Sequence, residues 1–301
     1  MGQTLKIAAY GLGSMGFGMA SACLRADHDV YGFDVASDPQ ERLVALGGKA
    51  LPALEQIGPE LGAVMVTVLN AAQTESVLFG PDGIVPHLSA GAVVLSCATV
   101  PPDFARKMAA ACAERGVHYL DAPISGGSAK AAQGALTIMA SGTAEAFDAA
   151  QPVLDAISEK VFRLGDGAGA GSAMKAVNQL LAGVHIATMA EALTFGMTQG
   201  VEPEKFVEVI SDCAGTSWML ENRAPHIVEG DYTPHSQVNI WPKDLGIVLD
   251  IARSAQFSAP ITAAALQQFL AAAGMGLGHE DDAAVAKVYA RNAGLNLPGE
   301  S

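Results

Sequence analysis

One lysine of this chain stands where its charge needs a chemical reason. Lys175 lies near the start of GSAMKAVNQLLAGVHIATMAEAL (171–193), a segment that is apolar almost all the way round and typical of one long helix. The helix dipole opposes a cation near a helix N-terminus, and burial of an unanswered ammonium is costly. A lysine desolvated in a pocket can titrate closer to neutrality and transfer a proton. We therefore consider two interpretations, a proton-transfer lysine beside an anionic ligand and a surface lysine whose stem covers apolar neighbours.

The same helix face carries a stripe of polar side chains. At the helical period, Lys175 shares this face with Asn178, Gln179, Ala182 and His185. Asn178 follows one turn after the lysine, where it could hold the amine or a substrate hydroxyl. His185 lies roughly 15 Å farther along the helix axis, so we expect it near the site or in the core.

A serine and two glycines form the second candidate site. In DAPISGGSAKAAQGALTIMASG (121–142), Ser125, Gly126 and Gly127 offer a hydroxyl and backbone N–H groups that can close around an oxyanion. This arrangement suits the binding of a carboxylate. The alternative is a plain glycine turn that leads into a helix near Ser128.

A G-x-G-x-x-G pattern follows the first expected strand and opens the first expected helix. In KIAAYGLGSMGFGMA the first glycine permits a tight turn, the second lets backbone approach a pyrophosphate, and the third lets helix and strand pack closely. The helix N-terminus adds N–H groups and a partial positive charge. By itself the pattern also fits an ordinary glycine turn. The predicted cofactor loop consists of Gly11, Leu12, Gly13, Ser14, Met15 and Gly16.

An acidic residue at the end of the next strand supports a dinucleotide. Asp34 follows Gly16 by 18 residues, the spacing at which a carboxylate accepts hydrogen bonds from a ribose diol. The alternative is a helix cap or loop carboxylate. Because no lysine or arginine follows before Arg42, a 2′-phosphate has no evident partner, and we predict NAD rather than NADP.

The elements that must position these residues differ between the two halves of the chain. The first half alternates helical segments with short β-rich runs that mostly lack a period of two, as in a parallel sheet covered on both faces. The pattern predicts an α/β, Rossmann-type, doubly wound sheet. The expected strands are 5–10, 29–34, 63–69, 92–97, 117–122 and 136–141, and the expected helices include 14–26, 38–47 and 101–115.

The second half is expected to be entirely helical. Gly165, Gly167, Gly169 and Gly171 mark a linker, after which no strand pattern remains. We predict an NAD-binding domain over residues 1–165 and an all-α domain over 166–301 for substrate binding and oligomerisation, joined by a long interdomain helix. The expected helices are 172–199, 203–213, 217–229, 242–255, 260–274 and 281–293.

Composition excludes several classes of partner. The 301 residues suit about two domains, and a formal charge of −14 disfavours nucleic acid and anionic membranes.

The four scattered cysteines are typical of reduced core thiols. No apolar run reaches the ~18 residues of a membrane span, and a strand from about Leu5 leaves no room for a signal peptide. We expect a cytoplasmic protein without a metal, since His226 and His235 near Asp231 match no ligand pattern.

Four motifs in order along nearly the whole chain resemble the β-hydroxyacid dehydrogenase family, which includes 3-hydroxyisobutyrate dehydrogenase, tartronate semialdehyde reductase and 6-phosphogluconate dehydrogenase. They are the glycine loop, DAPISGG, KAVN and KDL (243–245). The resemblance implies a carboxylate site at Ser125, Gly126 and Gly127, proton transfer by Lys175 and assistance by Asn178. It also implies that Lys243 reaches the cofactor and substrate, that Thr99 lies on the nicotinamide side, and that the protein is a homodimer or homotetramer acting on a small anionic hydroxy acid.

Further stretches are similar to one branch of this family, which oxidises the C2 hydroxyl of a four-carbon sugar acid with NAD. They are LNAAQTESVLFGPDGIVPHL, NQLLAGVHIA, AGTSWMLENRAPHIVEGDYTPHS and GHEDDAAV. Two departures lie on the cofactor side, where we expect Leu69 and Asn70 to contact NAD. Val68-Leu69-Asn70 stands where many relatives have Leu-Pro, and Ala98 replaces a serine before Thr99.

Three alternatives remain at this stage. One is another substrate of the same family, such as 3-hydroxyisobutyrate, D-glycerate, or a tartronate or succinic semialdehyde that would be reduced. The second is an imine reductase, which shares the architecture but in many cases replaces the lysine equivalent to Lys175. The third is a cofactor-binding sensor without turnover, which the intact lysine and anion loop disfavour.

Overall fold

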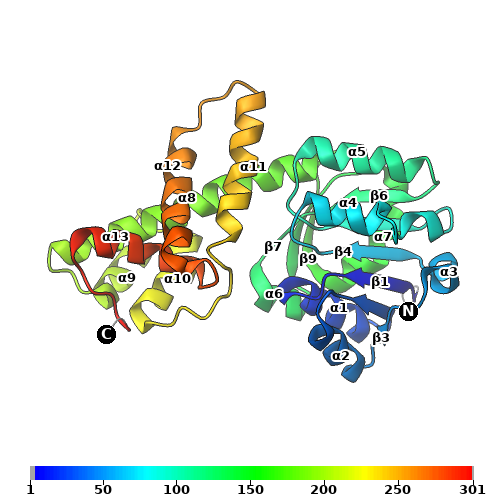
Figure 1. The fold of residues 1–301 in the computed structure, drawn as a ribbon, viewed down its shortest axis with the longest axis horizontal. Coiled ribbons are helices and arrows are strands. Elements are labelled where there is room, and N and C mark those ends of the chain that lie inside the picture. The colour runs from blue at the N-terminus through cyan, green and yellow to red at the C-terminus, as the bar shows by residue number, and fades with distance from the viewer. Residues whose placement is uncertain (1–3, 300–301) are drawn as a thin grey trace. The chain divides into compact units, whose positions relative to one another are not determined.

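The computed structural model describes residues 4–299 and divides the chain into two compact units, Met1–Lys175 and Ala176–Ser301 (Figure 1). Helix α8 (Ala170–Thr198) begins in the first unit and continues into the second. The division therefore falls inside this helix. The domain boundary expected after residue 165 stays a prediction.

The first unit is built on a six-stranded parallel sheet of order β3-β2-β1-β4-β5-β6. This confirms the predicted Rossmann-type fold. Most residues of the central strands are buried, which explains why the sequence shows no period of two there. The strands are β1 (Lys6–Tyr10), β2 (Asp29–Phe33), β3 (Lys49–Ala50), β4 (Ala63–Val66), β5 (Val93–Ser96) and β6 (His118–Asp121).

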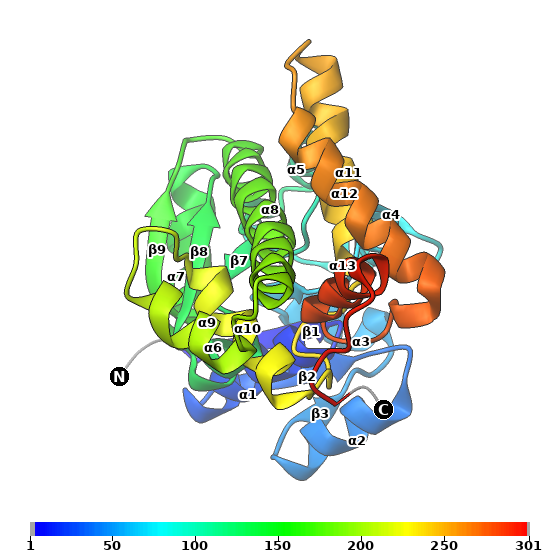
Figure 2. The ribbon, with the colours of Figure 1, turned by 90° about the vertical axis from the view of Figure 1, so that its left-hand side faces the viewer.

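Helices connect these strands and cover the sheet (Figures 1 and 2). They are α1 (Ser14–Arg25), α2 (Ser37–Ala45), α3 (Leu54–Ile57), α4 (Ala71–Phe79) and α5 (Pro102–Ala113), with 3₁₀ turns at Gly58–Glu60 and Val85–His87. Successive residues of β1 alternate between two hydrophobic clusters, since Ile7 and Ala9 belong to one and Ala8 and Tyr10 to the other. The sheet is therefore packed on both faces.

The last expected strand of this unit belongs to a different sheet. The segment predicted at 136–141 forms β8 (Leu136–Ala140), which pairs with β7 (Ile124–Ser125) and β9 (Ser158–Arg163) in a separate three-stranded sheet. Strands β3 and β7 were not expected, because two residues are too short for a pattern. Strand β9 was missed because most of its residues are exposed and half carry charges. Helices α6 (Gly127–Gln133) and α7 (Ala144–Ile157) precede and follow β8.

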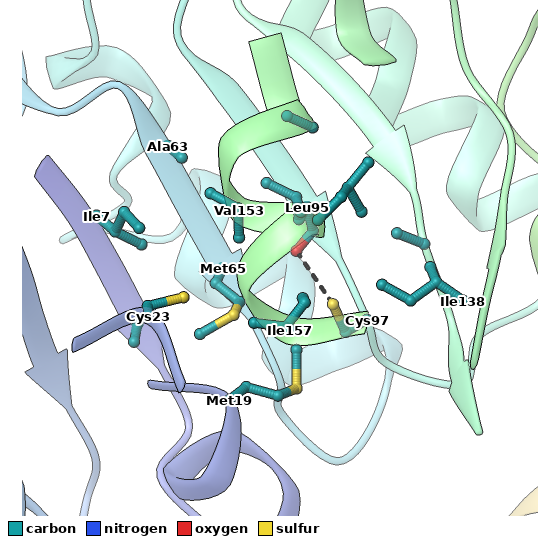
Figure 3. Close-up of a cluster of buried hydrophobic side chains, with 14 of the residues drawn as sticks. Ile7, Met19, Cys23, Ala63, Met65, Leu95, Cys97, Ile138, Val153 and Ile157 are labelled. Carbon is teal, nitrogen blue, oxygen red and sulfur yellow. Dashed lines mark hydrogen bonds between the residues drawn. The ribbon is translucent and has the colours of Figure 1, made fainter. Parts of the chain in front are cut away.

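Figure 3 shows one of the two hydrophobic clusters of the first unit, with Met65 and Leu95 from the sheet facing Val153 and Ile157 from α7. The Cys97 thiol lies in the same cluster and donates to the Leu95 carbonyl at 3.8 Å. Burial raises the pKa of Cys97 to about 12, so this thiol is protonated and unreactive at neutral pH.

The expectation of four core cysteines holds for three of them. Cys23, Cys97 and Cys112 are buried, whereas Cys213 is exposed. Cys213 follows the last turn of a surface helix in the second unit. The expectation was wrong there, because cysteine content alone cannot distinguish a buried from an exposed position.

The second unit is helical and contains no strand among its described residues, as predicted; Gln237 and Asp281 form an isolated β-bridge. Its helices and helical turns are the remainder of α8, α9 (Pro203–Ser211), α10 (Trp218–Glu229), α11 (Ile240–Ser254), α12 (Pro260–Ala272), a π-helical turn (Ala273–Leu277), a 3₁₀ turn (Asp282–Val285) and α13 (Ala286–Ala293). The helix expected at 281–293 is thus divided in two. The Trp241 and Phe269 rings stack in the core at 5.5 Å between centroids.

A buried ionic cluster joins the elements of this unit. Asp281 and Asp282 are both fully buried. Arg223 of α10 donates to Asp282 at 2.5 Å, and the Trp241 indole N–H of α11 donates to the other Asp282 oxygen at 2.9 Å. His226 lies 3.5 Å from Asp281. These bonds tie α10 and α11 to the turn before α13.

Helix α8 is also long and apolar enough, by length and composition alone, to cross a membrane. Counting uninterrupted apolar residues did not anticipate this, because Lys175, Asn178 and Gln179 interrupt the run without changing its overall character. The core helix of a soluble protein passes the same test, and Ile186 and Leu193 of α8 are buried in the second unit. The absence of a membrane partner stays a prediction.

Candidate active site

The three glycines of the first loop differ in what an added side chain would meet. Gly11 has a φ of +86°, and a Cβ there would lie 2.5 Å from the Thr67 carbonyl oxygen. A Cβ on Gly16 would lie 1.9 Å from the Gly11 carbonyl oxygen, so only glycine lets α1 pack on the turn. A Cβ on Gly13 would meet no atom within 4 Å. The space beside Gly13 is therefore open, as the approach of a dinucleotide phosphate to α1 requires.

Asp34 holds this loop in place. Its carboxylate accepts the Leu12 N–H at 2.7 Å through one oxygen and the Ala36 N–H at 3.0 Å through the other. The residue thus has the local turn role that we considered as the alternative, and it also lies directly against the glycine loop. Arg42, the first basic residue after it, places its guanidinium 4.4 Å from the centre of the Phe17 ring and 3.7 Å from Asp38.

The remaining residues expected at the cofactor follow β4 and β5. Carboxyl ends of parallel strands share one edge of the sheet, where ligands of such folds bind. Leu69 is 56% exposed, and Asn70 caps α4 by accepting the Gln73 N–H at 2.9 Å. Asn70 therefore has a structural role as the N-cap of α4. Thr99 is half-buried in the segment after β5.

The serine and glycines of the second site link β7 to α6. Ser125 pairs with Thr137 of β8 and is half-buried. Gly126 and Gly127 have φ values of +133° and +77°, and a Cβ on Gly127 would meet no atom within 4 Å. These left-handed conformations favour glycine, and the loop is open next to Gly127.

The structure buries Lys175 and brings it to this loop. The side chain is 9% exposed, and its Nζ donates to the Ile124 carbonyl at 2.9 Å. Ile124 immediately precedes Ser125 in β7. The amine of α8 is therefore next to the residues expected to bind a carboxylate, and Lys175 is not a surface lysine.

In the second unit two hydrogen bonds and an ion pair connect Asn178 to Lys243. Asn178 Nδ2 donates to Gln179 Oε1 at 2.9 Å, and Gln179 Nε2 donates to Asp244 Oδ2 at 2.5 Å. Lys243 Nζ lies 2.7 Å from Asp244 Oδ1. Sequence reasoning assigned no role to Gln179 and Asp244, although both are adjacent to residues that it singled out. Their burial, at 7% and 2% exposed, is the signal that was not visible.

The direction of donation along these hydrogen bonds is determined by Asp244, the buried acceptor. Carboxylate oxygens only accept, so Gln179 must direct its NH₂ group toward Asp244. Its amide oxygen then accepts from the Asn178 NH₂ group. Asn178 is left with its own oxygen as the group available to a hydroxyl or an ammonium.

His185, His226 and His235 all lie in the second unit. His185 is half-buried, and the His226 and His235 rings contact each other edge-on at 4.7 Å. Within residues 4–299 no group of three or more histidine, cysteine, aspartate or glutamate side chains could hold a metal ion.

Two family models together match most of the chain. One describes the NAD-binding domain of 6-phosphogluconate dehydrogenase and matches residues 6–165. The other describes the NAD-binding domain of NADP-dependent 3-hydroxyisobutyrate dehydrogenase and matches residues 169–289. The chain belongs to the β-hydroxyacid dehydrogenase family. The predictions of a dehydrogenase and of NAD as its cofactor are confirmed at the level of the family.

Several curated relatives align over nearly the full length. The L-threonate dehydrogenase of Cupriavidus necator is 48% identical, with 98% of this chain and 99% of the relative covered. The L-threonate dehydrogenase of Haemophilus influenzae is 44% identical over 98% of each chain. The 2-(hydroxymethyl)glutarate dehydrogenase of Eubacterium barkeri is 36% identical over 99% of each.

Solved structures agree with this assignment. A 3-hydroxyisobutyrate dehydrogenase from Salmonella typhimurium superposes with a TM-score of 0.89 at 42% identity, covering 94% of this chain and 99% of the other. An imine reductase from Streptomyces aurantiacus, at 21% identity and a TM-score of 0.64, shares the fold alone, with 94% of this chain and 99% of the other covered.

Proposed function

We propose that this protein oxidises L-threonate at C2 to 2-oxotetronate, with NAD as the hydride acceptor. The observation that carries the chemistry is the buried Lys175 amine, bonded to the Ile124 carbonyl beside the Ser125–Gly127 loop. The substrate is proposed from relatives named L-threonate dehydrogenase at 42–48% identity over the full chain.

Held by the Gly11–Gly16 loop, NAD would supply hydride-acceptor chemistry for the substrate carbinol. The Ser125 hydroxyl and the N–H groups of Gly126 and Gly127 hold the substrate carboxylate and so orient its carbinol carbon. This gives an anion a local site within a chain whose net charge of −14 opposes it.

Lys175 accepts the hydroxyl proton as the hydride leaves. A neutral amine can donate one hydrogen to a carbonyl and still take up a proton on its nitrogen. The Ile124 carbonyl therefore orients the base without blocking its chemistry. In the same proposal, the Asn178 oxygen accepts a hydrogen bond from the substrate hydroxyl or from the lysine, and Lys243 contacts cofactor and substrate.

The glycine loop Gly11–Gly16, Leu69, Asn70 and Thr99 are proposed to bind the cofactor, and Asp34 to select NAD. The carboxylate that accepts the Leu12 N–H would repel a 2′-phosphate, and Arg42 is engaged with Phe17 and Asp38. We expect kcat/KM to favour NAD over NADP. A preference for NADP would contradict this role of Asp34.

We also propose a cytoplasmic homodimer or homotetramer without nucleic-acid or membrane partners. Support comes from large apolar side chains on the exposed side of α8, among them Val177, Leu181 and Phe195 at 54%, 49% and 66% exposed. Monomeric soluble proteins rarely expose extended apolar surface. Light scattering after size-exclusion chromatography tests the oligomeric state, and a monomer would contradict it.

The test of the substrate is NAD-linked oxidation of a panel of acids. L-Threonate, D-erythronate, D-glycerate and 3-hydroxyisobutyrate are compared by the rate of NADH formation. We expect the highest kcat/KM with L-threonate. A higher value with another acid would move the assignment within the family, and activity with a cyclic imine alone would indicate an imine reductase. Binding of NAD without turnover of any acid would indicate a sensor.

A further inference from the structure

Hydrogen bonds from two residues at the start of α8, Ser172 and Lys175, reach residues 121–124. Ser172 donates to the Asp121 carboxylate through its N–H at 2.9 Å and its hydroxyl at 2.6 Å. One turn later, Lys175 donates to the Ile124 carbonyl at 2.9 Å. The partners are 51 residues apart in both cases. The lysine is thus held by its own bond and by an anchor at the preceding turn.

Asp121 is a buried carboxylate that accepts hydrogen bonds from residues at the start of α8. It is 1% exposed, and it also accepts the Gly169 N–H at 2.8 Å and the Ser141 hydroxyl at 3.2 Å. The first N–H groups of a helix have no partner within the helix, so an acceptor here determines where the helix begins. Burial raises the pKa of Asp121, while the bonds from Ser172, Gly169 and Ser141 act against this rise.

The backbone of α8 approaches its neighbours closely at the same point. A Cβ on Gly171 would lie 2.4 Å from the Met139 carbonyl oxygen and 2.7 Å from the Asp121 carbonyl oxygen. The Gly171 N–H donates to the Ser141 hydroxyl at 2.9 Å. Both obstacles are backbone atoms, so a side chain at residue 171 would displace the first turn of α8.

We propose that Asp121, with Ser141 and Gly171, is a positioning group for Lys175. The anchor determines where α8 begins and therefore where the Lys175 amine lies relative to the Ser125–Gly127 loop. This inference rests on the proposed function of Lys175. Asp121 itself takes no part in proton transfer, because its oxygens accept from the helix start and from Ser141.

Two alanine substitutions in the same helix provide a matched test. Gly171→Ala displaces the first turn, whereas in Gly196→Ala the nearest atom to the new Cβ is 3.5 Å away, an ordinary contact. A misplacement of about 1 Å can cost about 10²-fold in rate, so we expect Gly171→Ala to lower kcat by about that factor. The Kd for NAD should not change, because the Gly11–Gly16 loop is untouched. Gly196→Ala should leave kcat and Kd unchanged.

Substitution of the carboxylate distinguishes position from charge. Asn in place of Asp121 keeps one oxygen for the two N–H groups, and its NH₂ group can donate to the Ser172 hydroxyl, which can also accept. We expect Asp121→Asn to retain most of the wild-type kcat and Asp121→Ala to lose activity as Gly171→Ala does. A kcat for Gly171→Ala equal to that of the wild type, or loss of activity in Asp121→Asn with an intact helix start, would overturn the proposal.

Amide hydrogen exchange at residues 170–176 tests the anchor without substrate. We expect protection to fall in Gly171→Ala and Asp121→Ala and to remain in Asp121→Asn and Gly196→Ala. If the wild type oxidises none of the acids, the proposed function is wrong. The amide exchange measurement then still tests whether Asp121 and Gly171 fix the start of α8. Unchanged protection in Gly171→Ala would refute the proposed anchor at the start of α8. If Asp121→Ala does not fold, the result for Gly171→Ala alone tests the anchor.

Discussion

At the scale of single residues, the environment of Lys175 explains why a lysine can stand in an apolar helix. Its side chain is 9% exposed, and its amine donates to a backbone carbonyl. The bond to the Ile124 carbonyl offsets part of the cost of burying this amine.

Removal of this amine should abolish most of the turnover. General acid–base catalysis contributes about 10²–10⁴-fold, so we expect Lys175→Ala to lower kcat by at least about 10²-fold in the NAD-linked assay. Lys160→Ala is the matched control, since Lys160 is an exposed lysine of the same unit beside the Phe162 ring. Retention of turnover by Lys175→Ala would exclude the lysine as the base.

The two glycines at the ends of the G-x-x-G part of the loop should respond to alanine in opposite ways. A Cβ on Gly13 meets no protein atom, whereas one on Gly16 meets the Gly11 carbonyl at 1.9 Å. We expect Gly13→Ala to keep the wild-type Tm and to weaken NAD binding by about tenfold or more, equivalent to at least about 1.4 kcal/mol. Gly16→Ala should lower the free energy of unfolding by about 1–3 kcal/mol, as overpacking does.

Thermal unfolding and fluorescence titration with NAD measure the two effects. A Gly13→Ala variant with normal NAD affinity would show that the open space beside this glycine is not used by the cofactor.

At the scale of elements, helix α8 carries groups that belong to both compact units. Its first turns are bonded to Asp121 and Ile124 of the first unit. Beyond residue 175, Gln179 is bonded to Asp244 of α11 in the second unit. Lys175 and Asn178 are therefore carried by one helix, and each is held by hydrogen bonds within its own unit.

The hydrogen bond from Gln179 of α8 to Asp244 of α11 should affect catalysis, because it determines the orientation of the Asn178 amide. Asn in place of Asp244 can donate as well as accept, so Gln179 and Asn178 would no longer be held in one orientation. Leaving a buried hydrogen bond imperfect costs about 1–3 kcal/mol, and we expect Asp244→Asn to lower kcat/KM by about tenfold or more. Asp250→Asn, which alters an exposed carboxylate of the same helix paired with Arg253 at 3.3 Å, should not change it. A wild-type kcat/KM in Asp244→Asn, or an equal loss in both variants, would contradict the role of Asp244.

At the scale of the whole molecule, the helical unit depends on an ionic cluster inside its core. Asp281 and Asp282 are adjacent and fully buried, and Arg223 lies 2.5 Å from Asp282 and 4.0 Å from Asp281. Burial, together with the neighbouring Asp281, raises the pKa of Asp282 to about 6, against the opposing effect of Arg223. The folded state therefore binds a proton at this carboxyl that the unfolded chain releases at lower pH.

The sign of the resulting pH dependence follows by linkage. Stability contributed by a raised pKa is present at low pH and is lost as the pH rises from about 4 through about 6. Relative to Asp282→Asn, which cannot titrate, the wild-type second unit should lose on the order of 3 kcal/mol over this interval. Urea unfolding followed by tryptophan fluorescence reports on this unit, because Trp218 and Trp241 both lie in it. A difference between the two proteins that stays constant with pH would contradict the shift.

Much of this architecture was predictable from local patterns. The G-x-G-x-x-G loop, the buried parallel strands and the helices of the second half depend on neighbours within a few residues, and most boundaries agree within a few positions. Strands β3, β7 and β9 were missed because two of them are only two residues long and the third is mostly exposed. The placement of β8 in a second sheet was not visible either, because a single strand pattern does not name its partners.

By itself, the sequence determined the candidate residues and the elements that carry them, because residue type and periodicity act locally along the chain. Only the tertiary structure decided that Lys175 is buried against Ile124, that Asp121 anchors the start of its helix, and that Asp244 orients Gln179. These contacts join residues 51 to 65 positions apart. Hydrogen bonds over such separations form when strands and helices pack, and no spacing rule along the chain specifies them.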